Sequence, residues 1–230
     1  MEIDIRTLVL FYLIANIMNN GLIFLIWRMY RKNYRGLAFL FADMCLQTVA
    51  SFFFLLRGYI PEVVSIVATN LFSVLGLLFV LKGLERFFDR ERIRVYNYII
   101  FCIFMALVFY YSIVNNNLFV RNLCLSSMII FYNGQSALLL YRDLSPDKRR
   151  IARYMAGVLL LYCLFNLARI IAMVSVPQLE NEFFVSGIVN SISMIGYILL
   201  NILVTAGIIL MVSHRLLLEV QTEKDKYNRA

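Results

Sequence analysis

Residues 61–94 read PEVVSIVATNLFSVLGLLFVLKGLERFFDRERIR, an apolar run followed directly by basic side chains. The apolar part, 61–82, is long enough for one membrane-spanning helix, which needs ~20 apolar residues. The basic part places Lys82, Arg86, Arg90, Arg92 and Arg94 at one end of that helix. Because cytoplasmic loops of membrane proteins hold the excess of Lys and Arg, this stretch predicts a transmembrane helix and the side on which it ends.

The composition of the whole chain predicts six more such helices. Of the 230 residues, 62% are hydrophobic, about seven times the ~20 that one span requires. Only 16% are charged, against ~25% in soluble domains, so a soluble globular fold is excluded. We therefore expect an all-α integral membrane protein, a bundle of seven transmembrane helices. The expected helices cover 5–27, 37–57, 61–82, 96–113, 118–140, 150–175 and 184–212, with Asn115, Asn116 and Asn117 stopping the fourth.

The positions of the basic residues predict the orientation of this bundle. Eighteen of the 22 Lys and Arg fall on one side, which makes that side cytoplasmic, places the N-terminus outside and puts the C-terminus in the cytoplasm. The net charge of +8 is then a membrane topology signal, and we expect membrane lipids and no nucleic acid as partners. The eighteen are Arg28, Arg31, Lys32, Arg35, Lys82, Arg86, Arg90, Arg92, Arg94, Arg142, Lys148, Arg149, Arg150, Arg153, Arg215, Lys224, Lys226 and Arg229.

The chain lacks the residue sets that catalysis and metal binding require. The single histidine, His214, is expected at the inner membrane edge, and no paired intramembrane aspartates or HExxH motif occur. No lysine lies in 184–212, which excludes a retinal Schiff base in the last helix. We expect no enzyme activity, no cofactor, no catalytic residues and no metal site. The four cysteines are interpreted as packing thiols within helices: Cys45, Cys102, Cys124 and Cys163.

Ionisable and polar residues inside the spans are the functional candidates, since they are costly in hydrocarbon. Helical spacing and depth predict a cavity in the outer half where Arg57 and Arg169 hold a small anionic or amphiphilic ligand, because the planar guanidinium grips carboxylates and phosphates bidentately. Asn166 and Asn190 would add hydrogen bonds. The complete candidate site is Arg57, Asn70, Asn166, Arg169, Asn190, Ser193 and Tyr197.

Each of these residues also has a purely structural interpretation. Asn and Ser in membrane helices often only tie neighbouring helices together, at ~0.6 kcal/mol per bond. The two arginines could instead pair with Glu62, Glu180 or Glu182 and anchor outer loops. For Asp43, which lies near the inner end of its helix, we expect a salt bridge to a loop arginine more than a proton relay. The segment 85–92 is expected to be a solvated juxtamembrane stretch facing lipid headgroups.

The tail, 213–230, is expected to continue the last helix into the cytoplasm as a signalling linker, separate from the membrane domain 1–212. Leu217, Val220, Lys224 and Tyr227 are spaced by three, four and three residues, which is the start of a coiled-coil seam. We assign the relay to Leu217, Val220 and Tyr227. A free amphipathic helix end explains the same spacing, because a coiled coil is recognised over at least ~3–4 heptads.

Five segments of the chain match a known family of membrane domains: MEIDIRTL (1–8), LRGYIP (56–61), GLERF (83–87), ARII (168–171) and RLLLEV (215–220). With them the chain resembles the seven-helix sensory input domains of bacterial signalling proteins, which precede PAS, GGDEF (diguanylate cyclase) or histidine kinase modules. The resemblance implies a homodimeric sensor in the bacterial inner membrane that passes a helix movement through its tail to an output module after residue 230. The alternative is a small transporter or channel, for which residues 1–230 alone would support uptake or conductance in liposomes.

Overall fold

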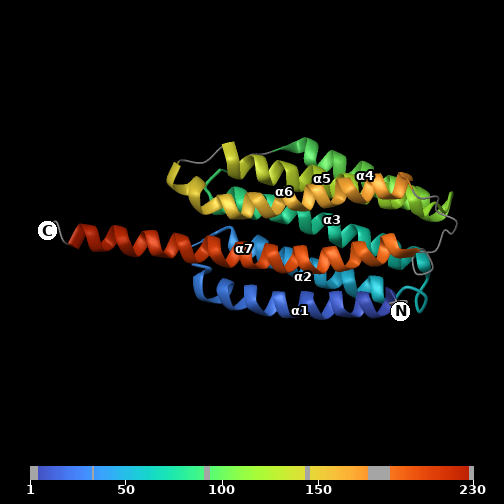
Figure 1. Cartoon of the computed structure of the whole chain (residues 1–230), viewed down its shortest axis with the longest axis horizontal. Helices are drawn as coiled ribbons and strands as arrows, with labels where there is room; N and C mark the ends of the chain where they lie inside the picture. The colour runs from blue at the N-terminus through green and yellow to red at the C-terminus, as the bar shows by residue number, and fades with distance from the viewer. Residues whose placement is uncertain (1–4, 33, 91–93, 143–145, 176–186, 228–230) are drawn as a thin grey trace.

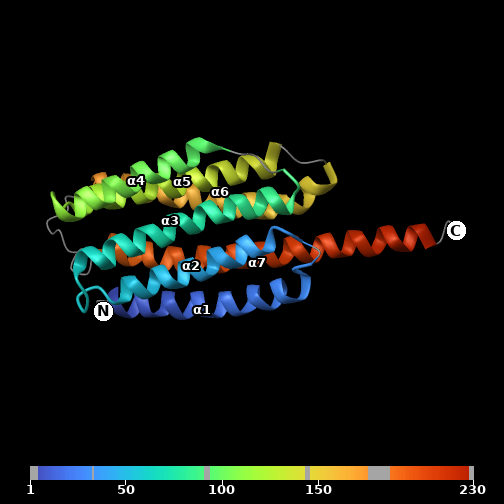
Figure 2. The same ribbon diagram turned by 180° about the vertical axis from the view of Figure 1, so that it is seen from behind.

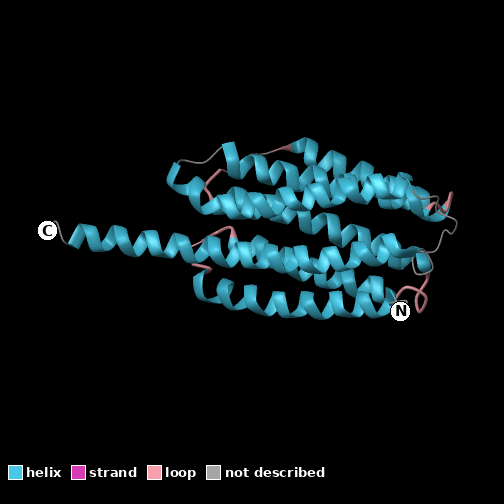
Figure 3. Cartoon of the chain, viewed as in Figure 1, coloured by secondary structure: helices cyan, strands magenta, loops and turns pink. Residues whose placement is uncertain are grey.

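The computed structural model describes residues 5–32, 34–90, 94–142, 146–175 and 187–227, and every regular element in these ranges is an α-helix (Figure 3). All seven are long and apolar enough to cross a membrane, which confirms the predicted all-helical fold with seven helices of membrane-spanning length. The helices are α1 (Ile5–Tyr30), α2 (Leu37–Leu55), α3 (Glu62–Phe87), α4 (Val95–Ile113), α5 (Leu118–Arg142), α6 (Pro146–Ser175) and α7 (Gly187–Tyr227).

Six of the helices form a closed ring, and the remaining helix, α4, lies outside it. Around the ring the order is α1, α2, α3, α5, α6 and α7, and α7 packs back against α1. Within the described residues, α4 contacts only α3 and α5, so it covers the outside of the ring (Figure 2). The first and last helices are therefore neighbours, and the interior of the ring is bounded by six helices.

Many polar side chains of the bundle are buried and many large apolar ones are exposed, unlike the usual pattern of a soluble domain. Asn16, Asn133 and Asn201 are buried between helices, whereas Met18, Ile103 and Leu164 are each more than half exposed. A large exposed apolar surface is costly in water but is suited to hydrocarbon. The burial pattern therefore agrees with the composition: many polar side chains are buried between the helices, and large apolar side chains cover the outer surface.

The ends of α3, α4 and α5 follow recognisable local chemistry. Helix α4 ends at Ile113, as predicted, and Asn117 then caps α5 by accepting a hydrogen bond at its Oδ1 from the Val120 amide at 3.2 Å. Helix α3 runs to Phe87, beyond the predicted end at 82. It closes with Asp89 at φ 57°, the Asp89 amide bonded to the Arg86 carbonyl and the Arg90 amide to the Glu85 carbonyl, a Schellman motif.

The extension of α3 changes the interpretation of segment 85–92. Glu85 is 1% exposed and forms ion pairs with Lys82 at 2.8 Å and Arg94 at 3.8 Å, and Phe87 and Phe88 are buried. The expectation of a solvated stretch is therefore wrong for 85, 87 and 88. Residues 91–93 lie outside the described residues. The apolar pair Phe87 and Phe88 explains the difference, since it joins the core beside α2 and α7.

Helices α2 and α3 approach each other closely near the start of α2. Gly36, which precedes the first residue of α2, lies against the backbone of α3 at Gly83 and Phe87. A β-carbon at position 36 would come within 2.6 Å of the Phe87 amide nitrogen and closer still to the Gly83 carbonyl oxygen. Only glycine fits at this crossing, because the facing atoms belong to the backbone and have little freedom to move.

Helix α7 is much longer than a membrane is thick. Its 41 residues correspond to about 62 Å at 1.5 Å per residue, twice the ~30 Å of a hydrocarbon core. The helix continues without a break past the rest of the bundle, as Figure 1 shows in red. The end of the bundle from which it leaves is called the exit end below. The basic residues Arg28, Arg35, Arg86 and Arg142 lie at that end, where α1, α3 and α5 finish.

Candidate functional site

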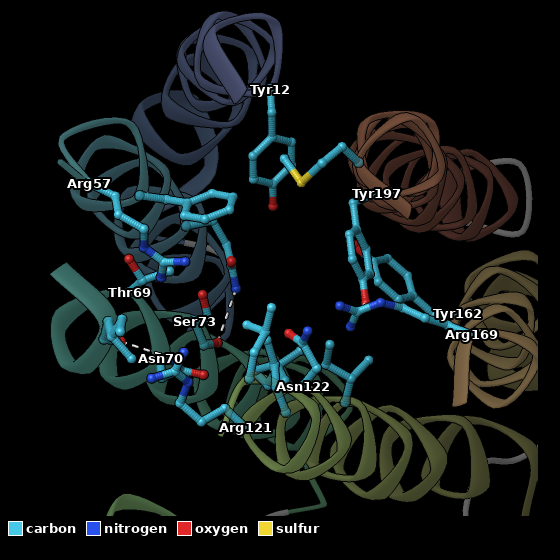
Figure 4. A pocket seen from close by; sticks show the side chains of 18 residues that line it. Tyr12, Arg57, Thr69, Asn70, Ser73, Arg121, Asn122, Tyr162, Arg169 and Tyr197 are labelled. Atoms are coloured by element: carbon cyan, nitrogen blue, oxygen red, sulfur yellow. Dashed lines mark hydrogen bonds between the residues drawn. The ribbon is translucent and has the colours of Figure 1, made fainter. Parts of the chain in front are cut away.

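A cavity of about 140 Å³ lies inside the ring, in the half of the bundle farther from the exit end (Figure 4). All six ring helices contribute to its wall, and α4 contributes none of the described lining residues. The lining combines apolar side chains with three arginines and contains no Asp or Glu. The lining residues are Tyr12, Gln47, Phe54, Arg57, Ile66, Thr69, Asn70, Ser73, Leu77, Leu118, Arg121, Asn122, Leu125, Ile129, Tyr162, Arg169, Met194 and Tyr197.

Arg169 is a buried charge in this wall. It is 6% exposed, and its Nη1 donates to Ser126 Oγ at 3.0 Å and to Tyr197 Oη at 3.2 Å. Its Nε is buried and has no hydrogen-bond partner among the described residues, and no carboxylate within that part of the chain lies within salt-bridge distance. A guanidinium with only neutral partners retains most of the electrostatic cost of its burial.

Arg57 and Arg121 add positive charge to the same cavity. Arg121 is 4% exposed and donates from Nη1 to Asn116 Oδ1 at 2.8 Å and to the Tyr111 carbonyl at 3.4 Å. Arg57 follows α2, and its guanidinium lies over the Phe54 ring, 4.9 Å from the centroid.

Four of the seven predicted site residues line the cavity. They are Arg57, Asn70, Arg169 and Tyr197, which come from different parts of the ring. Asn166 is buried and does not line it, but its Oδ1 accepts a hydrogen bond from Tyr197 Oη at 2.7 Å. Asn190 and Ser193 are also buried without lining the cavity.

The sequence-based site omitted several lining residues, chiefly Arg121 and Asn122. Both lie in the first turns of α5, and neither was assigned to the predicted site. Their burial was the missing information, and a helical projection of 118–140 gives a partial signal because Asn122 and Ser126 share one face. Of the alternative partners proposed for the arginines, Glu180 and Glu182 lie outside the described residues.

A second, smaller cavity of about 30 Å³ continues toward the exit end and shares Tyr12, Gln47, Leu77 and Tyr162 with the first. Its lining includes Asp43, which is 3% exposed and accepts a hydrogen bond at Oδ1 from Gln47 Nε2 at 3.1 Å. No Lys or Arg side chain in the described part of the chain pairs with Asp43, so the expected salt bridge is wrong there. Gln47 is well placed to bind the Asp43 carboxyl group, since α2 brings residues four apart onto one face.

Hydrogen bonds between buried polar side chains join α1 to α2 and to α7. Asn16 donates from Nδ2 to Ser51 Oγ at 3.2 Å and accepts at Oδ1 from Asn201 Nδ2. All three residues are at most 5% exposed. This group therefore joins helices that are far apart in the sequence.

The Asn16–Asn201 contact predicts a measurable coupling between the first and last helices. In a double-mutant cycle with Asn16→Ala and Asn201→Ala in detergent, we expect a coupling energy of about 0.6–1.7 kcal/mol, the range for interhelical hydrogen bonds in membranes. The free energy of unfolding measures it. The control cycle pairs Asn16→Ala with Asn70→Ala on α3, whose amide bonds the Ile66 carbonyl of its own helix. Equal coupling in both cycles would contradict the prediction.

Five residues hold α7 where it leaves the bundle, and we call them the exit clamp: Tyr34, Phe87, Asp89, Arg215 and Glu219. Arg215 donates from Nη1 to the Phe87 carbonyl at the end of α3 and pairs with Asp89 at 4.0 Å and Glu219 at 3.6 Å. Its guanidinium also lies over the rings of Tyr34 and Phe87, at 4.7 and 4.9 Å from their centroids.

Tyr34 completes the exit clamp from the loop between α1 and α2. Its hydroxyl donates to Glu219 Oε2 at 2.9 Å, and it is 2% exposed. Burial and the adjacent Glu219 carboxylate raise the pKa of Tyr34 to about 12, so the hydroxyl remains protonated over the physiological range. The exit clamp therefore ties α7 to both α3 and the α1–α2 loop.

Around the exit clamp, some apolar side chains of α7 are packed and others are exposed. Leu216 and Leu218 pack against the core, whereas Leu217 and Val220 are 61% and 66% exposed. Two of the three predicted relay residues thus lie on an uncovered apolar surface. Tyr227 is the last residue of α7, and its side chain lies outside the described residues.

Comparison of the chain with protein-family models, with curated proteins and with solved structures finds no match.

Proposed function

We propose that the chain is the sensory input domain of a bacterial signal-transduction protein. The observation that carries this proposal is the single helix α7. It lines the cavity with Met194 and Tyr197 at one end of the bundle, passes through the exit clamp and continues to Tyr227. One rigid element thus joins a buried cavity to a point well outside the bundle, which is what a relay of conformational change requires.

The proposed orientation has the N-terminus outside and the exit end in the cytoplasm of a cell with a bacterial inner membrane. The support is the charge pattern, since the loops at the exit end carry the basic residues. An occupant of the cavity would shift the populations of two packings of the ring, provided that it binds one packing more tightly than the other. The movement would reach a cytoplasmic output module through residues 213–230, in a homodimer that pairs Leu217 and Val220.

The phase of α7 beyond the exit clamp is the sharpest test of this function. Insertion of one alanine after Gln221 turns everything that follows by about 100°, and insertion of seven restores the coiled-coil phase. With a diguanylate cyclase joined after Ala230, we expect one inserted residue to change basal output by at least fivefold and seven to restore it. The rate of cyclic dinucleotide formation in membranes measures the output.

Matched insertions of the same lengths after the exposed Val114, in the α4–α5 turn outside the ring, serve as the control and should leave output within twofold, because Asn116 and Asn117 stay next to α5. An output that is insensitive to the length of the insertion after Gln221 would overturn the relay.

A further inference from the structure

The hydrogen-bonding groups of the large cavity are biased toward donors, and two of the buried ones have no partner. Asn122 is 7% exposed, and its Nδ2 has no hydrogen-bond partner within the described chain; the same holds for Arg169 Nε. Both residues line the cavity, and Figure 4 shows their polar ends directed into it. Unsatisfied buried donors are rare in folded proteins and point to an acceptor that would complete them.

The two donors lie on neighbouring helices that are joined by a hydrogen bond. Arg169 Nη1 on α6 bonds Ser126 Oγ on α5, and Ser126 follows Asn122 by one helical turn. Residues four apart lie on the same helix face, so the guanidinium and the Asn122 amide border the same part of the cavity. Two adjacent donors, one of them charged, suit the two oxygens of a carboxylate.

The charge of the wall favours an anion over a neutral acceptor. Arg57, Arg121 and Arg169 all line the cavity, and no Asp or Glu does. Arg121 has only neutral hydrogen-bond acceptors, at Asn116 and the Tyr111 carbonyl. Coulombic attraction in this weakly polar interior is several times stronger than in water, so an anionic occupant relieves the cost of burying the guanidinium groups.

The volume of the cavity and its apolar lining residues restrict which organic group the ligand can carry besides its anionic head. A cavity of about 140 Å³ is close to the ~150 Å³ that holds one benzene molecule. Phe54, Ile66, Leu125, Ile129 and Met194 supply an apolar surface that an inorganic anion would leave uncovered. The matching occupant has an anionic head and a compact apolar body.

From these observations we infer that the cavity binds a small organic carboxylate of about the size of benzoate, with its head against Arg169 and Asn122. This assigns the ligand class of the sensory function proposed above and rests on that function for its biological role. The binding itself is a separate property, which the domain of residues 1–230 is expected to show without any output module.

The probe for the test is benzoate, titrated by calorimetry into residues 1–230 in phosphatidylcholine nanodiscs. We expect saturable binding of one benzoate per chain, no binding of the neutral analogue benzyl alcohol, and no binding of the larger anion 2-naphthoate. Arg169→Gln should weaken benzoate binding at least tenfold, and Asn122→Leu should weaken it three- to tenfold. Arg153→Gln, on the same helix but exposed at the exit end, should leave the affinity within twofold.

Two further measurements separate the possible outcomes. If Arg169→Gln lowers the yield of folded protein, Arg169→Lys keeps the charge but loses the planar fork and should still weaken binding at least threefold.

Repetition in phosphatidylglycerol nanodiscs distinguishes a free acid from a lipid headgroup: a benzoate affinity that falls tenfold or more there would overturn the free carboxylate. Absence of saturable binding by the unaltered chain, or unchanged affinity in both Arg169 variants, would also overturn it. Neither result bears on the phase dependence of α7, which tests the sensory function separately.

Discussion

Replacement of Gly36 by alanine is expected to destabilise the bundle by about 3 kcal/mol, because the new β-carbon overlaps the backbone of α3 at Gly83 and Phe87. Overpacking against side chains is partly relieved by rotation, but these contacts are with a carbonyl oxygen and an amide nitrogen. Helices α2 and α3 would have to separate along their shared contact. Thermal unfolding in detergent should show a midpoint lower by about 6–12 °C for a chain of this length.

Gly157 on α6 is the matched control for this substitution. A β-carbon at Gly157 meets no atom within 4 Å, and the residue is exposed in the middle of its helix. Gly157→Ala should therefore leave the midpoint unchanged or raise it slightly, since alanine favours helix by up to ~1 kcal/mol over glycine. A Gly36→Ala variant that unfolds at the temperature of the unaltered chain would show that the helices do not meet so closely.

Removal of the Arg215 side chain is expected to free α7 at the exit end. Arg215→Ala loses the hydrogen bond to the Phe87 carbonyl, the ion pairs to Asp89 and Glu219, and the contacts with two aromatic rings. The side chain is about one quarter exposed, so we expect a loss of about 2 kcal/mol in the free energy of local opening. Amide hydrogen exchange over residues 213–221 should become roughly 30-fold faster.

Two comparison variants make the Arg215 result specific to the exit clamp. Arg35→Ala removes an exposed basic residue from the same end of the bundle and should leave this exchange unchanged. Glu219→Gln keeps the Phe87 contact and should accelerate exchange by less than Arg215→Ala. Exchange rates over 213–221 that are equal in the unaltered chain and in Arg215→Ala would mean that α7 is held by its apolar contacts alone.

The helices could be predicted from the sequence because their signals are local. Apolar runs of the required length occur seven times, and Asn115–Asn117 stop α4 where expected. The order of the ring was not predicted, although one signal was present: residues 98–111 contain no Asn, Gln, Ser, Thr or charged side chain, whereas every ring helix carries such residues within its span. The end of α3 was placed too early because Lys82 and Glu85 are normally surface residues, whereas here they pair with each other.

The candidate site could be predicted in part, for a comparable reason. Intramembrane arginines are conspicuous, so Arg57 and Arg169 were assigned to one cavity, and the structure places both in its wall. Arg121 and Asn122 were missed because their depth depends on how α5 packs against α3 and α6. The exit clamp was missed because Tyr34, Phe87 and Arg215 are far apart in the sequence, and only the fold brings them together.

The closure of the ring by its first and last helices has a consequence for biosynthesis. Asn16 enters the membrane with α1, but its partner Asn201 is near the end of the chain. During synthesis, Asn16 can therefore form its hydrogen bond to Ser51 early. Its Oδ1 has no Asn201 partner until α7 has been inserted. The ring cannot be sealed before the ribosome has passed residue 201, so the arginine-lined interior is enclosed only in the last stage of membrane insertion.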